Sequence, residues 1–262
     1  MITGAASGLG RAFAEELGKR KARLVLADIN MDGAKETAER AKRNGAGDVI
    51  VEVCDVRKLE DLERVARITD DRFGATDLLI NNAGVAVSGR VGEIPIDDWR
   101  WIVDINLWGV IYGCHVWVPR FRAQAKGHVI NIASVAGLIA VAPLAAYNVT
   151  KFGVVGLSES LSAEFHGSPL GVTVVCPSFF KTEIAKNGRN AKAELAQEER
   201  TEKLMKASRV QADGVARCAL DTAERGELYS IPMADARWMW RIKRVAPRAF
   251  QKLTAFAVRR FT

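Results

Sequence analysis

A tyrosine and a lysine four residues apart are the side chains in this sequence best suited to moving a proton. Of the three tyrosines, only Tyr147 is followed four residues later by a lysine, Lys151. On a helix this spacing places both side chains on one face, with Cβ atoms roughly 5–6 Å apart. An ammonium group at that distance favours the phenolate and lowers the tyrosine pKa, so we expect Tyr147 to donate and accept a proton.

A serine precedes this pair where a hydroxyl group could join it. Ser134 directly follows an apolar stretch, residues 128–133, that predicts a strand. A helix carrying Tyr147 would return along the sheet, so the two side chains are expected to meet at the carboxyl end of this strand. The alternative is a solvated Tyr–Lys pair beside an ordinary turn serine.

A glycine-rich segment, residues 3–10, predicts a phosphate-binding turn. It reads Thr-Gly-Ala-Ala-Ser-Gly-Leu-Gly and leads into a stretch with helical periodicity. Glycines permit a tight turn and the close approach of a pyrophosphate to the helix N-terminus, where free N–H groups stabilise negative charge. An ordinary strand-to-helix turn is the alternative. The candidate cofactor-binding residues here are Gly4, Ser7, Gly8, Leu9 and Gly10.

An acidic residue follows this turn at the spacing expected of a ribose-binding carboxylate. Asp28 lies 18 residues beyond Gly10, at the end of an apolar stretch, and is followed by Ile29 and Asn30 rather than by a basic residue. A carboxylate there accepts hydrogen bonds from the ribose hydroxyls and repels a 2′-phosphate. Unless Asp28 only caps its strand, NAD is therefore expected over NADP, with Asp28 and Ile29 at the adenosine.

Strands and helices alternate along the chain and must position these residues. Apolar, β-branched stretches recur at 24–28, 49–53, 77–80, 128–133, 172–176 and 228–231. Helical periodicity follows the glycine-rich turn and covers 31–44, 58–73, 97–122, 147–165 and 211–223. Strands that are apolar on both faces, alternating with helices, predict one α/β domain with a doubly wound parallel sheet.

The combined motifs resemble those of the short-chain dehydrogenase/reductase family over about residues 1–232. They are residues 3–10, Asp55-Val56, Asn81-Asn82-Ala83-Gly84, Asn106, Ser134, Tyr147-x-x-x-Lys151 and Pro177-Ser178. The resemblance implies a Rossmann-like, mainly parallel sheet of seven strands. It also implies oxidoreduction of alcohols and carbonyl groups with a nicotinamide cofactor. Where the family usually has Pro-Gly, this chain has Pro177-Ser178.

The resemblance also implies a role for each matching residue. Tyr147 would transfer the substrate proton, Ser134 would bind the reacting oxygen and Lys151 would hold the nicotinamide ribose. Asn106 would kink its helix and anchor a water of the proton relay. Cofactor contacts are implied for Asp55 and Val56 at the adenine, for Asn82, Ala83 and Gly84 along the cleft, for Pro177, and for Thr182 at the carboxamide.

The net charge of +7 comes from the C-terminal end of the chain. Residues 235–262 hold eight Lys or Arg and one acidic residue, Asp235. Because the rest is balanced, nucleic-acid binding is not expected. Basic and apolar residues recur there every three or four positions, and Pro247 predicts two helices. We expect this extension to pack on the body or on a second subunit, with a membrane surface as the alternative.

The predicted organisation is a dehydrogenase domain at 1–234, with a lid insertion at about 178–210, and a basic amphipathic helical extension at 235–262. The four cysteines and three histidines have no zinc-ligand spacing, so no metal is expected. Unpaired cysteines and no evident signal peptide predict a cytoplasmic protein, with membrane association possible only through the extension. A homodimer or homotetramer is implied by the resemblance.

The predicted function is hydride transfer between NAD(H) and a lipophilic secondary alcohol or ketone, with Tyr147 as general acid and base. Apolar residues within 135–146 and from Phe179 onward are expected to line the substrate pocket, or else to belong to the core. An NADPH-dependent 3-ketoacyl-thioester reductase is one alternative, disfavoured by Asp28 and by Ser7 where a basic residue would precede Gly8. A non-catalytic, NAD(H)-sensing binding protein is another, disfavoured by the intact Ser134, Tyr147 and Lys151.

Overall fold

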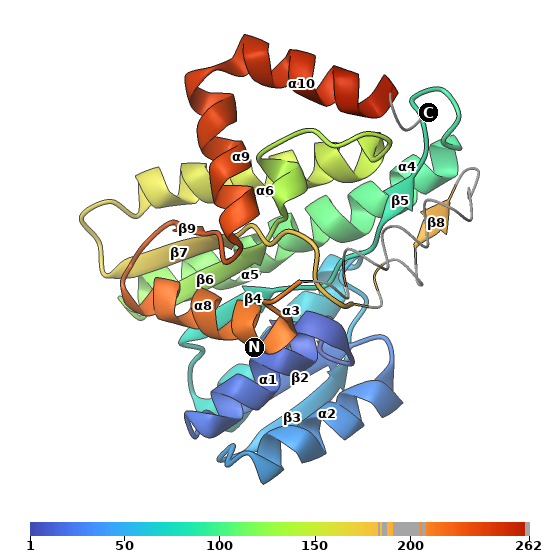
Figure 1. The fold of residues 1–262 in the computed structure, drawn as a ribbon. Coiled ribbons are helices and arrows are strands. Elements are labelled where there is room, and N and C mark those ends of the chain that lie inside the picture. Colours follow the sequence, from blue (N-terminus) through green and yellow to red (C-terminus); the bar gives the residue numbers. More distant parts are fainter. Residues whose placement is uncertain (183, 185–187, 191–204, 206–207, 260–262) are drawn as a thin grey trace.

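A seven-stranded parallel sheet forms the centre of the molecule (Figure 1). The computed structural model describes residues 1–182, 184, 188–190, 205 and 208–259. The strand order is β3-β2-β1-β4-β6-β7-β9, and every pairing in this sheet is parallel. The strands are β1 (Ile2–Thr3), β2 (Leu24–Asp28), β3 (Val49–Val53), β4 (Leu78–Asn81), β6 (Gly127–Ile132), β7 (Leu170–Val175) and β9 (Tyr229–Ser230). This confirms the predicted doubly wound, Rossmann-like α/β domain, with strand bounds within two residues of the predicted ones.

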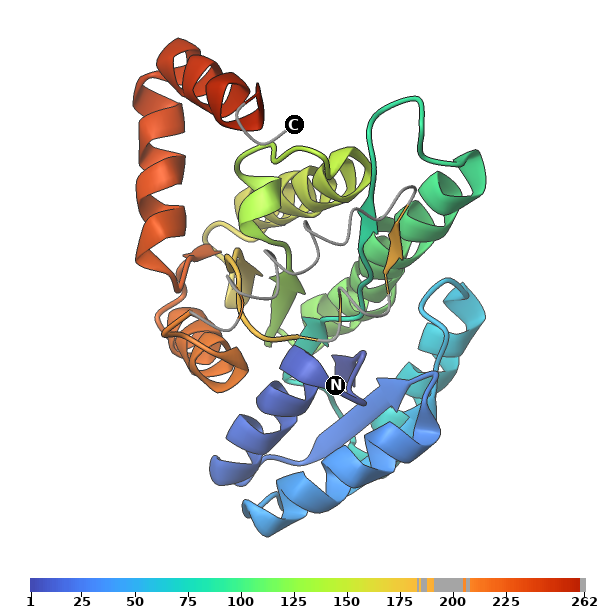
Figure 2. The same cartoon turned by 45° about the vertical axis from the view of Figure 1, so that its right-hand side comes forward.

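Helices cover both faces of the sheet, as its buried strands require (Figures 1 and 2). On one face α1 packs against both α2 and α8, and on the other α3 packs against α5, next to α6. Their bounds are α1 (Gly8–Lys19), α2 (Met31–Arg43), α3 (Leu59–Phe73), α5 (Gly109–Ala123), α6 (Ala145–Glu164) and α8 (Ala212–Glu224).

The helix predicted at 97–122 is broken in its middle. It begins as α4 (Ile96–Val103), passes through a π-helical turn (Asp104–Trp108) and continues as α5. The N–H group of Gly109 donates to the carbonyl of Asp104, five residues earlier, which defines the wider turn. By length and composition the whole stretch could cross a membrane, but half of its apolar window is buried inside the fold, as in a core helix.

One strand of a small second sheet lies within the segment where the sequence predicted a lid. Strand β5 (Val87–Ser88) pairs in parallel with β8 (Arg189–Asn190), a pairing that the sequence did not indicate. The helix predicted at about 190–207 lies outside the described residues, apart from residue 205.

The C-terminal extension forms two helices, divided at Pro247 as predicted. Helix α9 (Ala234–Val245) runs along one side of the molecule, and α10 (Pro247–Arg259) crosses its end beyond α6 (Figures 1 and 2). One side of α9 packs on the body, since Ala236 is buried and the rings of Trp240 and Tyr229 lie 4.9 Å apart. Phe250 of α10 is buried in the core, so one side of this helix also packs on the body.

Candidate active site

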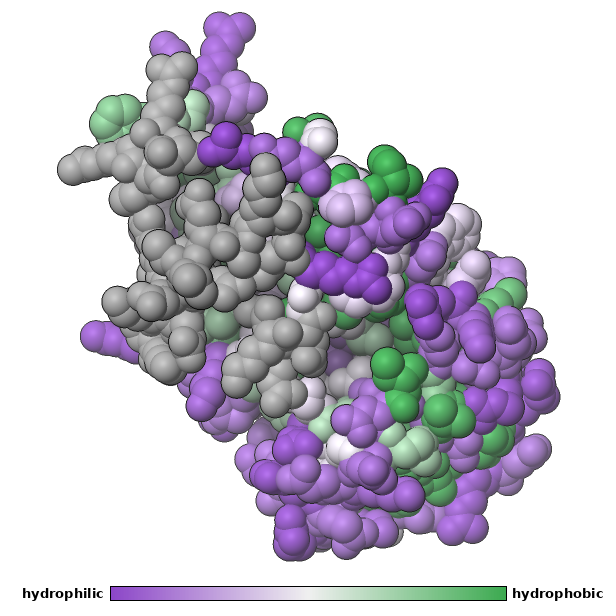
Figure 3. All heavy atoms as spheres, turned by 90° about the vertical axis from the view of Figure 1, so that its right-hand side faces the viewer, coloured by the Kyte–Doolittle hydropathy of each residue, from purple (hydrophilic) through white to green (hydrophobic). Residues whose placement is uncertain are grey.

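The predicted site residues gather at the carboxyl edge of the sheet. Asp28 ends β2, Asn82 follows β4 and Ser134 follows β6 by two residues, and these three strands are parallel members of one sheet. Figure 3 looks onto this edge, where the surface is hollowed beside the residues drawn in grey. In open α/β sheets ligands bind outside this edge, near the point where the strand order reverses, here between β1 and β4.

Tyr147, Lys151 and Ser134 meet as the sequence predicted. Helix α6 carries the tyrosine and the lysine, and the Lys151 Nζ lies 5.6 Å from the centre of the Tyr147 ring. The ammonium group is buried and donates to the carbonyl of Ile132, the last residue of β6, at 2.8 Å. The Ser134 hydroxyl lies close enough to the Tyr147 phenol to lower its pKa. One hydroxyl, one phenol and one ammonium group therefore converge from β6 and α6.

The lowered tyrosine pKa that the sequence predicted is wrong for the protein alone. Burial raises the pKa of Tyr147 to about 12, and the nearby Ser134 hydroxyl opposes that rise without cancelling it. Burial also lowers the pKa of Lys151 to about 8. Desolvation is the largest cause of both shifts, so it disfavours the phenolate of Tyr147 and the ammonium form of Lys151.

A glycine sets the distance between the serine and the helix. Ser134 begins a short 3₁₀ turn, and its Oγ accepts the N–H of Ala136 at 3.1 Å. A Cβ atom at Gly137 would lie 2.5 Å from the backbone carbonyl oxygen of Lys151. Only a residue without a side chain lets α6 come this close, so Gly137 allows the contact between Ser134 and Tyr147.

Asn106 lies in the π-helical turn and binds the loop after β4. Its Oδ1 accepts the N–H of Val85, and its Nδ2 donates to the carbonyl of the same residue, both at 2.8 Å. A Cβ atom at Gly84 would lie 3.3 Å from Asn106 Oδ1 and 3.6 Å from Lys151 Nζ. The loop carrying Gly84 therefore passes beside Lys151. The predicted kink at Asn106 is present, and its water-anchoring role stays a prediction.

The glycine-rich turn has the geometry that an anion site needs. Gly4 and Gly8 have φ angles of +63° and +53°, which side-chain-bearing residues rarely adopt. A Cβ at Gly10 would lie 2.1 Å from the carbonyl oxygen of Gly4. Ser7 caps α1 without a side-chain hydrogen bond, and the first turn of α1 has no acidic residue. The N–H groups around Gly8 and Leu9 are therefore left to a ligand, and the turn fits the diphosphate of a dinucleotide.

Asp28 is fixed beside this turn. One carboxylate oxygen accepts the N–H of Ala6 at 2.8 Å, and the other accepts the N–H of Asn30 at 2.9 Å. Ile29 next to it is 71% exposed. Asp55, predicted at the adenine, pairs with Arg57 at 2.6 Å, which holds the pKa of this carboxyl below its usual range. Its neighbour Val56 is buried, so its side chain also belongs to the core.

Thr3 positions the Asn82–Ala83 segment, a role that the sequence did not single out. Its Oγ1 accepts the N–H groups of Asn82 and Ala83 at 3.0 and 3.1 Å. The amide of Asn82 in turn donates to the carbonyl oxygens of Thr3 and Gly4. The glycine-rich turn and the cleft segment are thus one hydrogen-bonded unit. On the other side of the turn, Thr182 Oγ1 would lie 3.5 Å from a Cβ at Gly8.

The C-terminal extension reaches both loops that flank Ser134, which the sequence did not predict. Pro177 accepts the N–H of Val135 at 2.8 Å. Ser178, which stands where the family usually has glycine, donates to Asp235 at the start of α9 at 2.9 Å. Lys243 of α9 donates to the carbonyl of Leu138 at 2.7 Å. Helix α9 therefore supports the loops on either side of Ser134.

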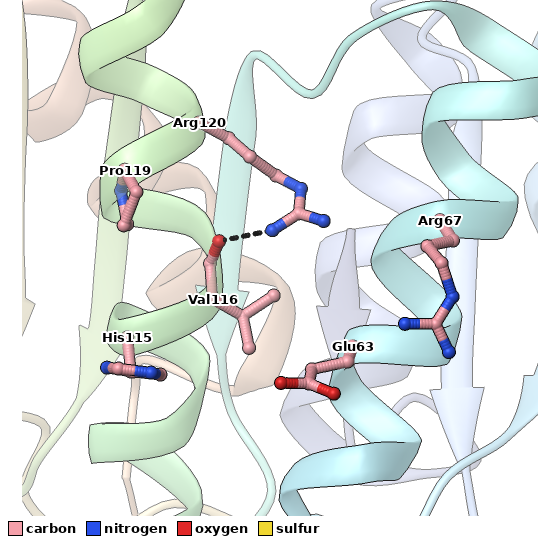
Figure 4. Close-up of a pocket in the computed structure, with 6 residues that line it drawn as sticks. All are labelled: Glu63, Arg67, His115, Val116, Pro119 and Arg120. Atoms are coloured by element: carbon pink, nitrogen blue, oxygen red, sulfur yellow. Dashed lines mark hydrogen bonds between the residues drawn. The ribbon is translucent and has the colours of Figure 1, made fainter.

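The residues predicted to line a substrate pocket divide into two groups. Val135, Leu138 and Ile139 belong to the buried core, as does Phe180. Phe179 is 37% exposed, and Ala142 is exposed as well. A hollow of about 300 Å³ elsewhere, between α3 and α5, contains no predicted site residue (Figure 4). It is lined by Glu63, Arg67, His115, Val116, Pro119 and Arg120.

Comparison with known proteins agrees with this geometry. The sequence profile of the family described as short chain dehydrogenase matches residues 1–193. The chain belongs to the short-chain dehydrogenase family. An oxidoreductase of Mycobacterium tuberculosis named SadH is 32% identical over 263 residues, spanning all of this chain and 95% of SadH. A cyclohexanol dehydrogenase of an Acinetobacter species is 32% identical over 187 residues, or 70% of this chain and 73% of that enzyme.

One similar solved structure, of another short-chain dehydrogenase, contains NAD. The Burkholderia phymatum protein, crystallised in complex with NAD, superposes with a TM-score of 0.86 at 31% identity, covering 93% of this chain and 91% of that one. The chain is thus an oxidoreductase whose fold binds NAD or NADP. Among the described residues, no cluster of His, Cys, Asp or Glu could hold a metal ion.

Proposed function

We propose that this short-chain dehydrogenase transfers a hydride between NAD(H) and a lipophilic secondary alcohol or ketone. The observation that carries the proposal is the meeting of Ser134, Tyr147 and Lys151 beside Gly84. A binding protein that only senses NAD(H) has no need of a proton donor held by a hydroxyl and an ammonium group. The second alternative, an NADPH-dependent 3-ketoacyl-thioester reductase, is disfavoured by Asp28.

Residues from several elements would hold the cofactor. The turn from Gly4 to Gly10 would bind the diphosphate, and Asp28 would accept hydrogen bonds from the adenosine ribose, since each of its oxygens has a lone pair left. A 2′-phosphate would bring negative charge close to this carboxylate, which favours NAD. Lys151 would donate to the nicotinamide ribose, and Thr182 to the carboxamide. When bound, the nicotinamide supplies the hydride acceptor or donor.

The protein's own contribution to the chemistry is the movement of a proton. In alcohol oxidation the phenolate oxygen of Tyr147 takes the hydroxyl proton, and in carbonyl reduction the phenol returns it to the oxygen. Ser134 binds that same oxygen and orients it. Because burial raises the pKa of Tyr147 to about 12, the phenol form dominates in the protein alone, and a nearby positive charge is needed to form the phenolate.

The substrate class follows from the side chains around the serine. Val141, Ala142, Leu144 and Phe179 are half-buried or exposed and supply apolar groups, and residues 135–146 contain no arginine or lysine that would bind a carboxylate. The related Acinetobacter enzyme carries the name of a cyclic secondary alcohol, which agrees with this assignment.

Two further expectations belong to this proposal. A homodimer or homotetramer would use α6 and the π-helical turn that leads into α5, where Val149, Phe152 and Trp108 are exposed. A cytoplasmic location is supported by the four cysteines, all of which are free thiols.

A substrate panel tests the proposal. The absorbance of reduced cofactor is followed with NAD or NADP and with cyclohexanol, a long-chain secondary alcohol, or the matching ketones. A 3-ketoacyl thioester with NADPH provides the competing reaction. We expect turnover with the alcohols and NAD. Faster turnover of the thioester with NADPH would replace the proposed function by the reductase, and no turnover of any pair would favour the sensing protein.

A further inference from the structure

The C-terminal extension carries an exposed face with no partner in the described fold. Of the exposed large hydrophobic side chains, five lie here: Trp238, Ile242, Val245, Leu253 and Phe256, each 45–86% exposed. We call these five residues the apolar face of the extension. Exposed apolar side chains concentrated on two short helices mark an interaction surface.

On both helices, the apolar face lies on a different side from the residues that pack on the body. In α9, Ala236, Met239 and Lys243 are buried or half-buried, whereas Trp238, Ile242 and Val245 are exposed at a spacing of three or four. In α10, Phe250 is buried, and Leu253 and Phe256 are exposed. The apolar face is therefore not needed to hold the extension on the domain.

Basic side chains border the apolar face. Arg241, Arg248 and Lys252 are exposed, and no ion pair to them is found within the described part of the chain. The guanidinium of Arg241 lies 5.7 Å from the centre of the Trp238 ring. The only acidic residue of the extension, Asp235, accepts a hydrogen bond from Ser178. The bordering charge is thus positive and unneutralised.

We propose that α9 and α10 bind the surface of an anionic membrane. Helices with an aromatic and aliphatic face beside a basic one lie in the lipid headgroup region, where apolar burial and attraction to anionic lipids add. A second copy of the chain fits less well. A two-fold interface would place this basic surface against itself, with no acidic residue to pair with it.

Membrane docking of the extension would bring the active site to the bilayer. Helix α9 binds the loop at Leu138 through Lys243 and the loop at Ser178 through Asp235, and these loops flank Ser134. A lipophilic alcohol could then enter from the lipid phase. This consequence rests on the proposed function, whereas the docking itself does not.

Vesicle co-sedimentation of the full chain tests the docking. Vesicles of phosphatidylcholine alone are compared with vesicles that also contain phosphatidylserine, at low and high salt. We expect binding only with phosphatidylserine, weakened by salt. The triple variant Arg241→Gln, Arg248→Gln, Lys252→Gln should lower the partition coefficient by roughly 100-fold. A second variant, Trp238→Ser, Leu253→Ser, Phe256→Ser, should abolish binding.

A control with the same change in net charge separates local from general electrostatics. Lys35→Gln, Arg43→Gln, Arg67→Gln removes three exposed charges from α2 and α3, which lie away from the extension (Figure 1). It should bind vesicles within about twofold of wild type. Circular dichroism and NADH binding check that all variants fold.

Three results would overturn the docking: equal binding to both kinds of vesicle, wild-type binding by the extension variants, or a control that loses as much as they do. Light scattering tests a subunit interface. If wild type does not bind vesicles and the variant with three serine substitutions has a lower molecular mass than wild type, the apolar face belongs to a subunit interface. Turnover of cyclohexanol with NAD should be the same in all variants. If wild type turns over none of the alcohols and ketones of the substrate panel, the proposed function is refuted and the vesicle result stays intact.

Discussion

The cofactor side and the catalytic side of the site are held by different means. On the cofactor side, glycine backbone fills the space, and an atom added at Gly10 would meet the Gly4 carbonyl at 2.1 Å. On the catalytic side, buried polar side chains bind the backbone, as Lys151 binds Ile132 and Asn106 binds Val85. The cofactor side should therefore fail when atoms are added, and the catalytic side when polar atoms are removed.

An added methyl group on the cofactor side should give the largest loss. Gly10→Ala places a Cβ against backbone that cannot rotate away, so the turn must open. We expect the dissociation constant of NADH to rise by roughly 100-fold and the melting temperature to fall. Fluorescence titration with NADH measures the first effect. Gly47→Ala is the matched control, because its Cβ would meet only ordinary contacts at 3.5 Å or more. Equal binding by Gly10→Ala and Gly47→Ala would contradict the account.

Removing the buried ammonium group should change how stability depends on pH. The pKa of Lys151 is about 8 in the folded protein and 10.5 in the unfolded chain. Between these values the unfolded chain binds more protons, so the contribution of Lys151 to the free energy of unfolding rises with pH. Relative to Lys151→Met, wild type should gain up to about 3 kcal/mol over this range.

Urea denaturation of both proteins at a series of pH values measures this gain. The raised pKa of Tyr147 acts in the opposite direction above pH 10, but it is present in both proteins and largely cancels in the difference. A difference in unfolding free energy that stays constant from pH 7 to pH 10.5 would show that Lys151 is not desolvated.

Neutralising the ribose carboxylate should give a smaller effect, on cofactor choice. Asp28→Asn keeps the shape of the side chain and removes the charge that would face a 2′-phosphate. We expect the ratio of NADPH to NADH dissociation constants to fall about tenfold. Asp32→Asn, an exposed residue in the first turn of α2, is the control and should leave the ratio unchanged. If Asp28→Asn has the wild-type ratio of NADPH to NADH dissociation constants, Asp28 does not select the cofactor.

The same contrast explains what the sequence could and could not predict. The glycine-rich turn and the Tyr147–Lys151 pair depend on spacings within one strand, turn or helix, which local rules describe. The contacts of Ser178 with Asp235 and of Lys243 with Leu138 join residues 57 and 105 positions apart. No local pattern marks such partners, because they are chosen by the packing of α9 on the finished domain.

The direction of the Tyr147 pKa shift was missed for a related reason. The spacing of Tyr147 and Lys151 predicts a favourable charge beside the phenol, and that part is present. How far water is excluded depends on every element packed around α6, and desolvation proved the larger influence. The sequence identified the reacting groups but not their surroundings.

Tyr147→Phe tests the central claim most directly. The substitution removes the phenolic oxygen and leaves the ring, so the packing of α6 should persist. We predict that turnover with NAD and a secondary alcohol falls by about 10³-fold, while the dissociation constant of NADH stays within about twofold of the wild-type value. Wild-type turnover in Tyr147→Phe, with NADH still bound, would show that this tyrosine does not move the proton.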